Sequence, residues 1–256
     1  MFTNRPSIIA GIAASIAAPL SHAAITLVDY STVVATTTED FSGFTSSGSA
    51  PYNGLVQGNG LAFGERFAGQ QLSSQTVSFP TVGGSSRFDV LSGSPTPSLT
   101  LLAGNANQNL WIGDAGLPSG FMIVGCGPAG SGFGPGGAGH GSIAVLFDED
   151  QSQLGFSIGG QNDSIGVVSF FRRDGSLIGT VNIDLPNLQP SGVPPELSFG
   201  FLRDGGVADI AGMSFTNVDP MGVGMDNFIF SNSIPAPGAV ALLGLAGLVG
   251  GRRRRA

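Results

Sequence analysis

The residues best spaced for chemistry are three glycines that follow an apolar run. Gly125, Gly127 and Gly130 form a Gly-x-Gly-x-x-Gly pattern, and Asp148 follows at the end of a later apolar run. Such glycines let a backbone approach the pyrophosphate of a dinucleotide, while the acid binds a ribose hydroxyl. This chemistry requires a helix directly after the glycines, because its N-terminal amides hold the phosphates. Residues 131–141 instead contain six glycines and one proline, which oppose helix formation. We therefore interpret the stretch as a glycine-rich surface loop.

Few side chains could act as a nucleophile or a general base. Cys126 is the single cysteine, and His140 is the one histidine outside the stretch 1–23. No nucleophile-elbow pattern accompanies His140, and one His with one Cys does not make a zinc site. The 17 acidic residues could supply a carboxylate pair for glycoside hydrolysis, but most follow turns, where Asp is common for local reasons. We therefore expect no catalytic residue and a protein that is not an enzyme.

Trp111 is the one candidate side chain for contact with a ligand, and the alternative is simple packing of the ring in the core. Sugar binding normally uses exposed aromatic rings, and Trp111 lies beside Asp114 in a loop-like region. The 18 phenylalanines, apart from Phe2, are better explained as core residues.

The elements that position these residues are predicted to be strands. The 42 glycines and 16 prolines, with many Ser, Thr, Val and Phe residues, suit short strands and turns. Apolar residues alternate over residues 143–147, 154–158, 168–170, 197–201 and 210–215, and an Asp-Gly turn at Asp174 predicts a hairpin. Pro95 and Pro97 confine residues 85–103 to an edge or a loop. The pattern predicts an all-β fold, a single antiparallel β-sandwich over residues 24–233.

The N-terminal stretch, 1–23, has the pattern of a signal peptide. Arg5 precedes an apolar stretch over residues 8–18, and Ser21-His22-Ala23 is a small-x-small cleavage site. We expect secretion with cleavage after Ala23. The alternative, a first transmembrane helix, requires a longer apolar stretch than this one.

The charge of the predicted sandwich limits its partners. Residues 24–233 hold five arginines, no lysine and all 17 acids, so their net charge is 5 − 17 = −12. Nucleic acids and anionic lipid surfaces are poor partners for such a domain, whereas metal cations suit it. Since Cys126 is alone, no intrachain disulfide stabilises this exported chain.

The C-terminal stretch, 234–256, combines a proline motif, an apolar run and a basic end. Pro235, Ala236, Pro237 and Gly238 precede an apolar run over residues 239–251, and Arg252, Arg253, Arg254 and Arg255 follow it. A spanning helix needs about 20 residues. The apolar run is shorter than this, so it predicts a weak, transient anchor. The arginines resist transfer across the bilayer and should stay cytoplasmic. The alternative is a buried core helix followed by a basic tail.

This tail resembles the PEP-CTERM sorting signal of Gram-negative bacteria in its three-part order and its position, over residues 234–256. The resemblance implies that an exosortase-like membrane protease binds and cleaves the tail, after transient anchoring in the inner membrane. The chain would then reach the cell surface or the extracellular matrix, with a role in biofilm or surface structure. Ala236 and Gly238 replace the usual acidic centre and its follower, so this is a Pro-Ala-Pro-Gly variant.

The second half of the chain resembles the jelly-roll-like, carbohydrate-binding-type sandwiches common among PEP-CTERM proteins. The matching segments are residues 147–148, 154–156, 170–181, 199–201, 215–220 and 225–228. The resemblance suggests that Glu39 or Asp40 meets Asp226 at one structural Ca²⁺ site, and Ca²⁺ is the one cofactor that we consider. The alternative function is a secreted, lectin-like or weakly hydrolytic protein that acts on an extracellular polysaccharide.

Overall fold

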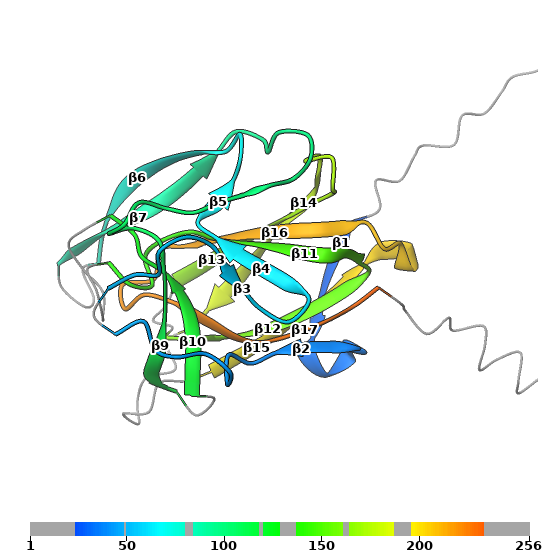
Figure 1. The fold of residues 1–256 in the computed structure, drawn as a ribbon, viewed down its shortest axis with the longest axis horizontal. Coiled ribbons are helices and arrows are strands. Elements are labelled where there is room, and N and C mark those ends of the chain that lie inside the picture. The colour runs from blue at the N-terminus through cyan, green and yellow to red at the C-terminus, as the bar shows by residue number, and fades with distance from the viewer. Residues whose placement is uncertain are drawn as a thin grey trace, which may run out of the picture.

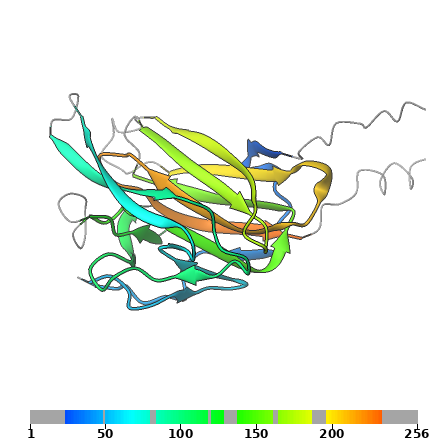
Figure 2. The ribbon, with the colours of Figure 1, turned by 90° about the horizontal axis from the view of Figure 1, so that it is seen from above.

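The chain folds into two antiparallel sheets that pack face to face (Figures 1 and 2). The structure is a computed structural model, and it describes residues 24–48, 50–79, 84–117, 120–128, 137–160, 164–186 and 196–232. Within these ranges the regular structure is β-strand, with two short 3₁₀ turns, η1 (Tyr30–Thr32) and η2 (Asp204–Gly206). The prediction of an all-β, antiparallel sandwich is confirmed.

One sheet contains the first and last strands of the described chain. It has seven strands in the order β1-β15-β12-β17-β10-β9, with β2 also paired to β17. These strands are β1 (Ile25–Asp29), β2 (Thr37–Glu39), β9 (Leu110–Leu117), β10 (Gly120–Gly125), β12 (Gln153–Gly159), β15 (Glu196–Arg203) and β17 (Gly224–Ser231).

The other large sheet has six strands in the order β14-β13-β16-β11-β4-β3. They are β3 (Val56–Gln57), β4 (Leu61–Gly64), β11 (Ile143–Gln151), β13 (Ser164–Phe171), β14 (Leu177–Leu185) and β16 (Ile210–Asn217). Two further pairs stand apart from it: β5 (Arg66–Phe67) with β8 (Leu101–Leu102), and β6 (Gln71–Ser78) with β7 (Ser85–Ser92). The predicted hairpin joins β13 to β14, and Gly175 takes φ +82° in its turn, a conformation that suits glycine.

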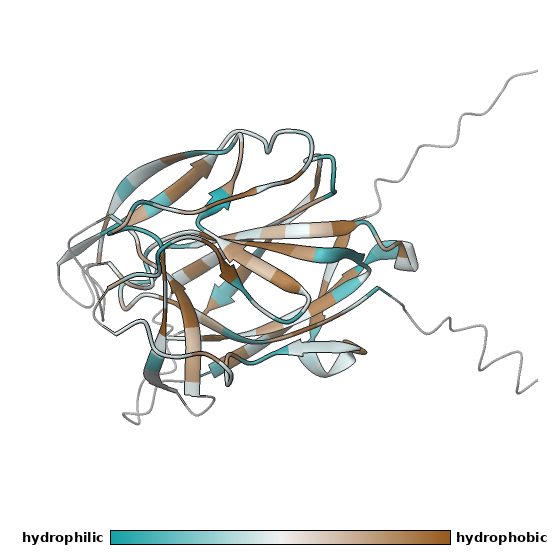
Figure 3. Ribbon diagram, in the orientation of Figure 1, coloured by the Kyte–Doolittle hydropathy of each residue, from teal (hydrophilic) through white to brown (hydrophobic). Residues whose placement is uncertain are grey.

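Phenylalanine rings join the two sheets. The ring of Phe170 in the six-stranded sheet lies 5.1 Å from that of Phe201 in the seven-stranded sheet. Phe63 and Phe228 make a second such contact, with ring centroids 5.2 Å apart. Figure 3 shows the resulting hydrophobic stretches along the strands of both sheets. Because successive side chains of a strand point to opposite faces, the alternation seen in the sequence delivers these rings to one shared core.

A smaller apolar cluster covers the outer face of the six-stranded sheet. There Ala62, Ala144 and Ala211 present small side chains, against which Phe67 and Leu101 of the β5–β8 pair pack. Methyl-sized side chains let the short pair approach the sheet closely. The β5–β8 pair therefore forms a second layer on this face of the sheet, beside β6 and β7. The candidate site lies against this second layer.

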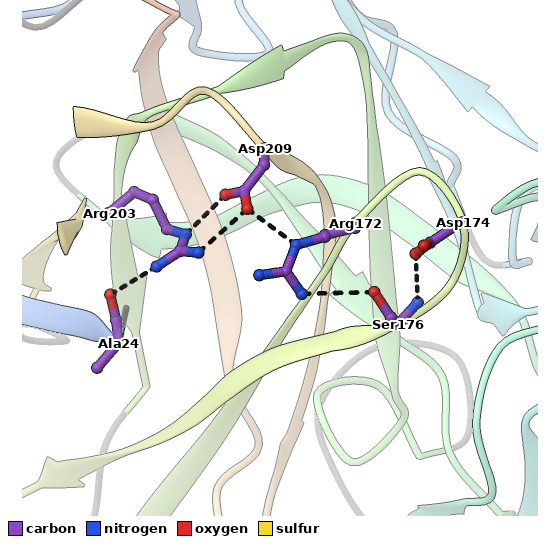
Figure 4. A network of polar contacts seen from close by, with 6 residues as sticks. All are labelled: Ala24, Arg172, Asp174, Ser176, Arg203 and Asp209. Carbon is purple, nitrogen blue, oxygen red and sulfur yellow. Dashed lines mark hydrogen bonds and ion pairs between the residues drawn. The ribbon is translucent and has the colours of Figure 1, made fainter. Parts of the chain in front are cut away.

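An ion network around the buried Arg203 holds the strand ends near the start of β1 (Figure 4). Arg203, which is 3% exposed, donates from Nε and Nη2 to the two carboxylate oxygens of Asp209, at 2.6 and 3.1 Å. Arg172 donates from Nε to the same carboxylate at 2.9 Å, and Arg203 also reaches the Ala24 carbonyl. One carboxylate thus links β15, the segment before β16 and the β13–β14 turn.

The described residues contain no helix long and apolar enough to span a membrane. The predicted apolar anchor over residues 239–251, the four arginines and the signal peptide lie outside those residues.

Candidate functional site

A polar cleft lies between β5, the β6–β7 hairpin and the loop after β8. Its volume is about 670 Å³, and its charged and amide side chains include Glu65, Arg66, Gln70, Gln71, Arg87 and Asp89. We call this feature the polar cleft. In Figure 1 the β6–β7 hairpin lies at the left end of the molecule, whereas β1 begins and β17 ends at the right. The β6–β7 hairpin, which forms one wall of the cleft, therefore lies far from the start of β1 and the end of β17.

Glu65 forms one carboxylate of the cleft. It lies between Phe63 and Phe67 in an alternating stretch, and it is 3% exposed. Its Oε2 accepts a hydrogen bond from Nη1 of Arg66, which forms an ion pair with it. A Cβ atom at Gly104 would overlap the Gln108 carbonyl oxygen and would lie 2.6 Å from Oε1 of Glu65, so a glycine is needed where the loop passes this carboxylate. The local sequence thus buries one charge and supplies its counter-ion at the next residue.

Asp89 forms the other carboxylate and comes from the middle of β7. It is 3% exposed, and its Oδ2 accepts a hydrogen bond from the backbone N–H of Ser142 at 3.0 Å. The Ser142 hydroxyl bridges the two halves of the site, because it lies 2.9 Å from the Glu65 carbonyl oxygen and 3.5 Å from Oδ2 of Asp89. Oδ1 of Asp89 has no hydrogen-bond partner among the described residues.

The two carboxylates differ in how burial affects them. Burial raises the pKa of Asp89 to about 6, and the charge of Glu65 adds to the rise, while Ser142 and Arg66 oppose it. Burial also raises the pKa of Glu65, but Arg66 beside it limits the rise. Near neutral pH Asp89 therefore holds a proton more readily than an exposed carboxylate does.

Cys126 and His140 lie behind the cleft and are packed as structural groups. Burial raises the pKa of the Cys126 thiol to about 12, and Asp89 adds to the rise, so the thiolate is strongly disfavoured. The His140 ring lies 4.6 Å from that of Phe88, and burial lowers its pKa. The sequence placed His140 in a surface loop, but the residue is buried.

The glycines of the Gly-x-Gly pattern serve close packing of two backbone segments. A Cβ atom at Gly125 would lie 2.5 Å from the carbonyl carbon of Gly141, and one at Gly127 would lie 2.7 Å from that of His140. Residues 137–142 are buried against this strand end, so the predicted surface location is wrong for them. Residues 129–136, which include Gly130, lie outside the described chain.

Trp111 is not the exposed ring that the sequence predicts. Its side chain is 7% exposed and packs with Met122 and Val124, and its Nε1 donates a hydrogen bond to the Gly48 carbonyl at 2.8 Å. The residue belongs to β9 and not to a loop, and its indole N–H is satisfied internally. Stacking of a sugar on this ring would require the surrounding chain to open.

The acids predicted to bind Ca²⁺ lie on or beside two paired strands, β2 and β17, in which Glu39 is opposite Phe228. However, the Glu39 carboxylate caps the backbone N–H groups of Phe41 and Asn59, and Asp40 is exposed. Asp226 is buried in β17. Across the described ranges, no three acidic, His or Cys side chains are placed to hold one metal ion.

Comparisons with known proteins identify no family. No protein-family model matches the chain, and no curated protein matches it. Among solved structures, it is similar to the CBM22-1 and GH10 modules of an endo-1,4-β-D-xylanase from Clostridium thermocellum, complexed with xylohexaose. The identity is 10% and the TM-score 0.32, and the match covers 51% of this chain and 25% of that chain. The chain thus spans about a quarter of the length of that protein.

Proposed function

We propose that the chain is a non-enzymatic surface protein that is exported through the inner membrane, anchored transiently by its tail and released by an exosortase-like protease. The released sandwich then belongs to the cell surface or the extracellular matrix. The observation that carries the proposal is the order of the tail: a proline motif at residues 235–238, an apolar run and four arginines. A short apolar run stopped by positive charges arrests a passing chain without anchoring it firmly.

The arrangement of the sandwich supports display from a membrane. Strand β1 begins and β17 ends at the same end of the molecule, and the β6–β7 hairpin lies at the other end in both views (Figures 1 and 2). Strand β17 is central in its sheet, and Ser231 at its end accepts a backbone hydrogen bond from Ser152. A tail that follows Ser231 would therefore hold the sandwich by the end opposite the β6–β7 hairpin.

The contacts of Ala24 support cleavage after Ala23. Its backbone nitrogen donates to Oδ2 of Asp204 at 3.1 Å, and its carbonyl oxygen accepts from the Asp204 backbone N–H at 3.0 Å. In the full chain this nitrogen is an uncharged amide. Cleavage between Ala23 and Ala24 would make it an ammonium group, and the hydrogen bond to Asp204 would become an ion pair.

We expect Asp204→Asn to lower the stability of the processed chain by about 0.5 to 1 kcal/mol at pH 6.5, as for an exposed ion pair. The α-amino group loses its charge above about pH 8, so the difference should shrink at pH 10. Urea unfolding of the processed wild type and variant at both pH values measures this. An equal loss at the two pH values would show that the α-amino charge plays no part.

Replacing Arg252, Arg253, Arg254 and Arg255 by serine tests the sorting step. In the producing cell, we expect the wild-type chain in the medium or at the surface, shortened at its C-terminus. The four-serine variant should lose this processing and accumulate uncut, because the stop signal is gone. Equal processing of both chains would contradict the proposal. Replacing the same four arginines by lysine, which keeps the positive charges, is the control and should leave the processing intact.

A second candidate function, carbohydrate binding, is favoured by the polar cleft. Its side chains are the carboxylate, guanidinium and amide groups that hydrogen-bond hydroxyls.

A further inference from the structure

We propose that the polar cleft binds a neutral oligosaccharide, whose hydroxyl groups donate to Asp89 and Glu65 and accept from the arginine and amide side chains of the cleft. The inference rests on the proposed display function for its setting, since an exported cleft meets extracellular polymers. Four observations carry it: an unsatisfied buried acceptor, the balance of charge, the polar lining and the fixed walls of the cleft.

Oδ1 of Asp89 is the first observation. The residue is 3% exposed and lines the cleft, and Oδ1 has no hydrogen-bond partner among the described residues. A buried carboxylate oxygen without a donor is unfavourable, and such atoms in native proteins call for an explanation. Oδ2 of the same group is held by Ser142. Oδ1 itself has almost no accessible surface, so a ligand hydroxyl would donate to it after a small rotation of the Asp89 side chain toward the cleft that the residue lines.

The charges of the cleft favour a neutral ligand. Glu65 and Asp89 are balanced by Arg66 and Arg87, so the cleft has no net charge when all four are ionised. An anion would meet two carboxylates, and a cation would meet two guanidinium groups. A metal ion is further disfavoured because Glu65 is already paired with Arg66, and the described chain has no three-ligand group.

The polar side chains around these charges match the hydroxyls of a saccharide. Gln70, Gln71, Asn105 and Gln108 add amides that can both donate and accept, and Ser73 and Ser74 add hydroxyls. The lining contains no aromatic ring among the described residues, so recognition would depend on hydrogen bonds. At about 670 Å³ the cleft lies within the usual range for small-molecule sites, roughly 300 to 1,000 Å³.

The walls of the cleft are held in place before any ligand binds. Nη2 of Arg87 donates to the Ser74 hydroxyl at 2.7 Å across the β6–β7 hairpin. On the opposite wall, Oδ1 of Asn109 accepts from the Gly104 backbone N–H, and its Nδ2 donates to the carbonyls of Tyr52 and Gly54. Oε1 of Gln70 accepts from the Phe67 N–H. Such fixed groups lose little freedom on binding.

Calorimetric titration of the processed chain tests the proposal, with cellohexaose, maltohexaose and mannohexaose as neutral probes and a hexagalacturonate as the acidic probe. EDTA is present throughout. We expect at least one neutral hexasaccharide to bind and to be recovered intact. Asp89→Asn should weaken that binding about tenfold or more, since it removes a charged acceptor, and Arg87→Gln should weaken it as well. Asp184→Asn, the same change on the exposed face of β14, should bind like the wild type.

Several results would overturn the proposal. These are no binding of any neutral probe by folded chain, binding of hexagalacturonate alone, equal binding by Asp89→Asn, or release of shortened sugars. Circular dichroism of each variant shows that it is folded. Failure of the display function would appear separately, as chains that keep their C-terminal tail. If correctly processed chain binds none of the neutral hexasaccharides, the result counts against the proposed role of the cleft alone.

Discussion

Replacing Asp89 by asparagine is expected to stabilise the protein by about 3 kcal/mol at pH 7.5. The pKa of Asp89 rises from 3.8 in the unfolded chain to about 6 in the folded one, mainly through burial. Each pKa unit corresponds to about 1.4 kcal/mol, so ionisation of this group opposes folding by that total above pH 6. Asparagine keeps an oxygen that can accept from the Ser142 N–H, and it carries no charge to bury.

The pH dependence of the free energy of unfolding shows whether ionised Asp89 stabilises or destabilises the folded chain. Between about pH 4 and 6 the folded chain keeps a proton on Asp89 that the unfolded chain releases, so wild-type stability falls as the pH rises. The advantage of Asp89→Asn should therefore grow over this window and vanish below pH 4. Urea unfolding at pH 7.5, 5 and 3.5 measures it, with Asp184→Asn as the exposed control. A variant less stable than the wild type at pH 7.5 would refute the prediction.

A residue whose removal stabilises the fold is one that serves another purpose, because binding groups are often held at the expense of stability. The unfolding experiment therefore tests the effect of Asp89 on stability, and the titration with hexasaccharides tests its effect on binding. We expect Asp89→Asn to gain stability and to lose binding in the same chain.

Asp209→Ala is expected to destabilise the protein by about 3 to 5 kcal/mol, the usual effect of breaking a buried ion pair. The carboxylate neutralises Arg203, which is 3% exposed, and also binds Arg172 (Figure 4). The change to alanine removes the charge that balances this buried guanidinium. Burial opposes ionisation of Asp209, but the two arginines outweigh it and lower the pKa. This contribution is present above about pH 4 and is lost as the pH falls below that value.

Asp150→Ala is the matched control for Asp209→Ala. Asp150 pairs with Arg173 at 2.7 Å, and these side chains are 35% and 42% exposed. An exposed pair contributes about 1 kcal/mol or less. Urea unfolding at pH 7 compares the two variants, and similar losses in both would show that burial of Arg203 does not set the energy of the network.

The main features of the sandwich could be predicted from local sequence. Alternating apolar residues over residues 143–147, 154–158 and 197–201 became β11, β12 and β15, because a strand delivers every second side chain to one face. The Asp-Gly turn at Asp174 became the β13–β14 turn. The order of strands in the sheets could not be predicted in this way, since it depends on contacts between residues far apart in the chain.

The candidate site was missed because its acids lie inside strand patterns. Glu65 occupies the position between Phe63 and Phe67 where the alternation predicts a buried apolar residue, and that mismatch was the available signal. Asp89 follows the buried Phe88 in β7, and the order of apolar and polar residues there did not indicate that the Asp89 side chain is buried. The two meet only because the β6–β7 hairpin folds back beside β5, which no local pattern encodes.

The predicted locations of Trp111 and of the glycine pattern were wrong for a related reason. Trp111 looked like a loop residue because Gly113 and Asp114 follow it, yet β9 pairs with β10 throughout this segment. The glycines at 137 and 141 looked like residues of a surface loop, but they let a buried segment lie directly against Gly127 and Gly125. Glycine marks both exposed turns and close backbone contacts, and sequence alone does not separate them.

Intact mass spectrometry of the native protein from its own host reads both mature ends, and so tests export and cleavage of the tail together. We expect a chain that starts at Ala24 and ends between Pro235 and Gly238, recovered outside the cytoplasm. Full-length chains that still carry Arg255, found as soluble cytoplasmic material, would contradict it.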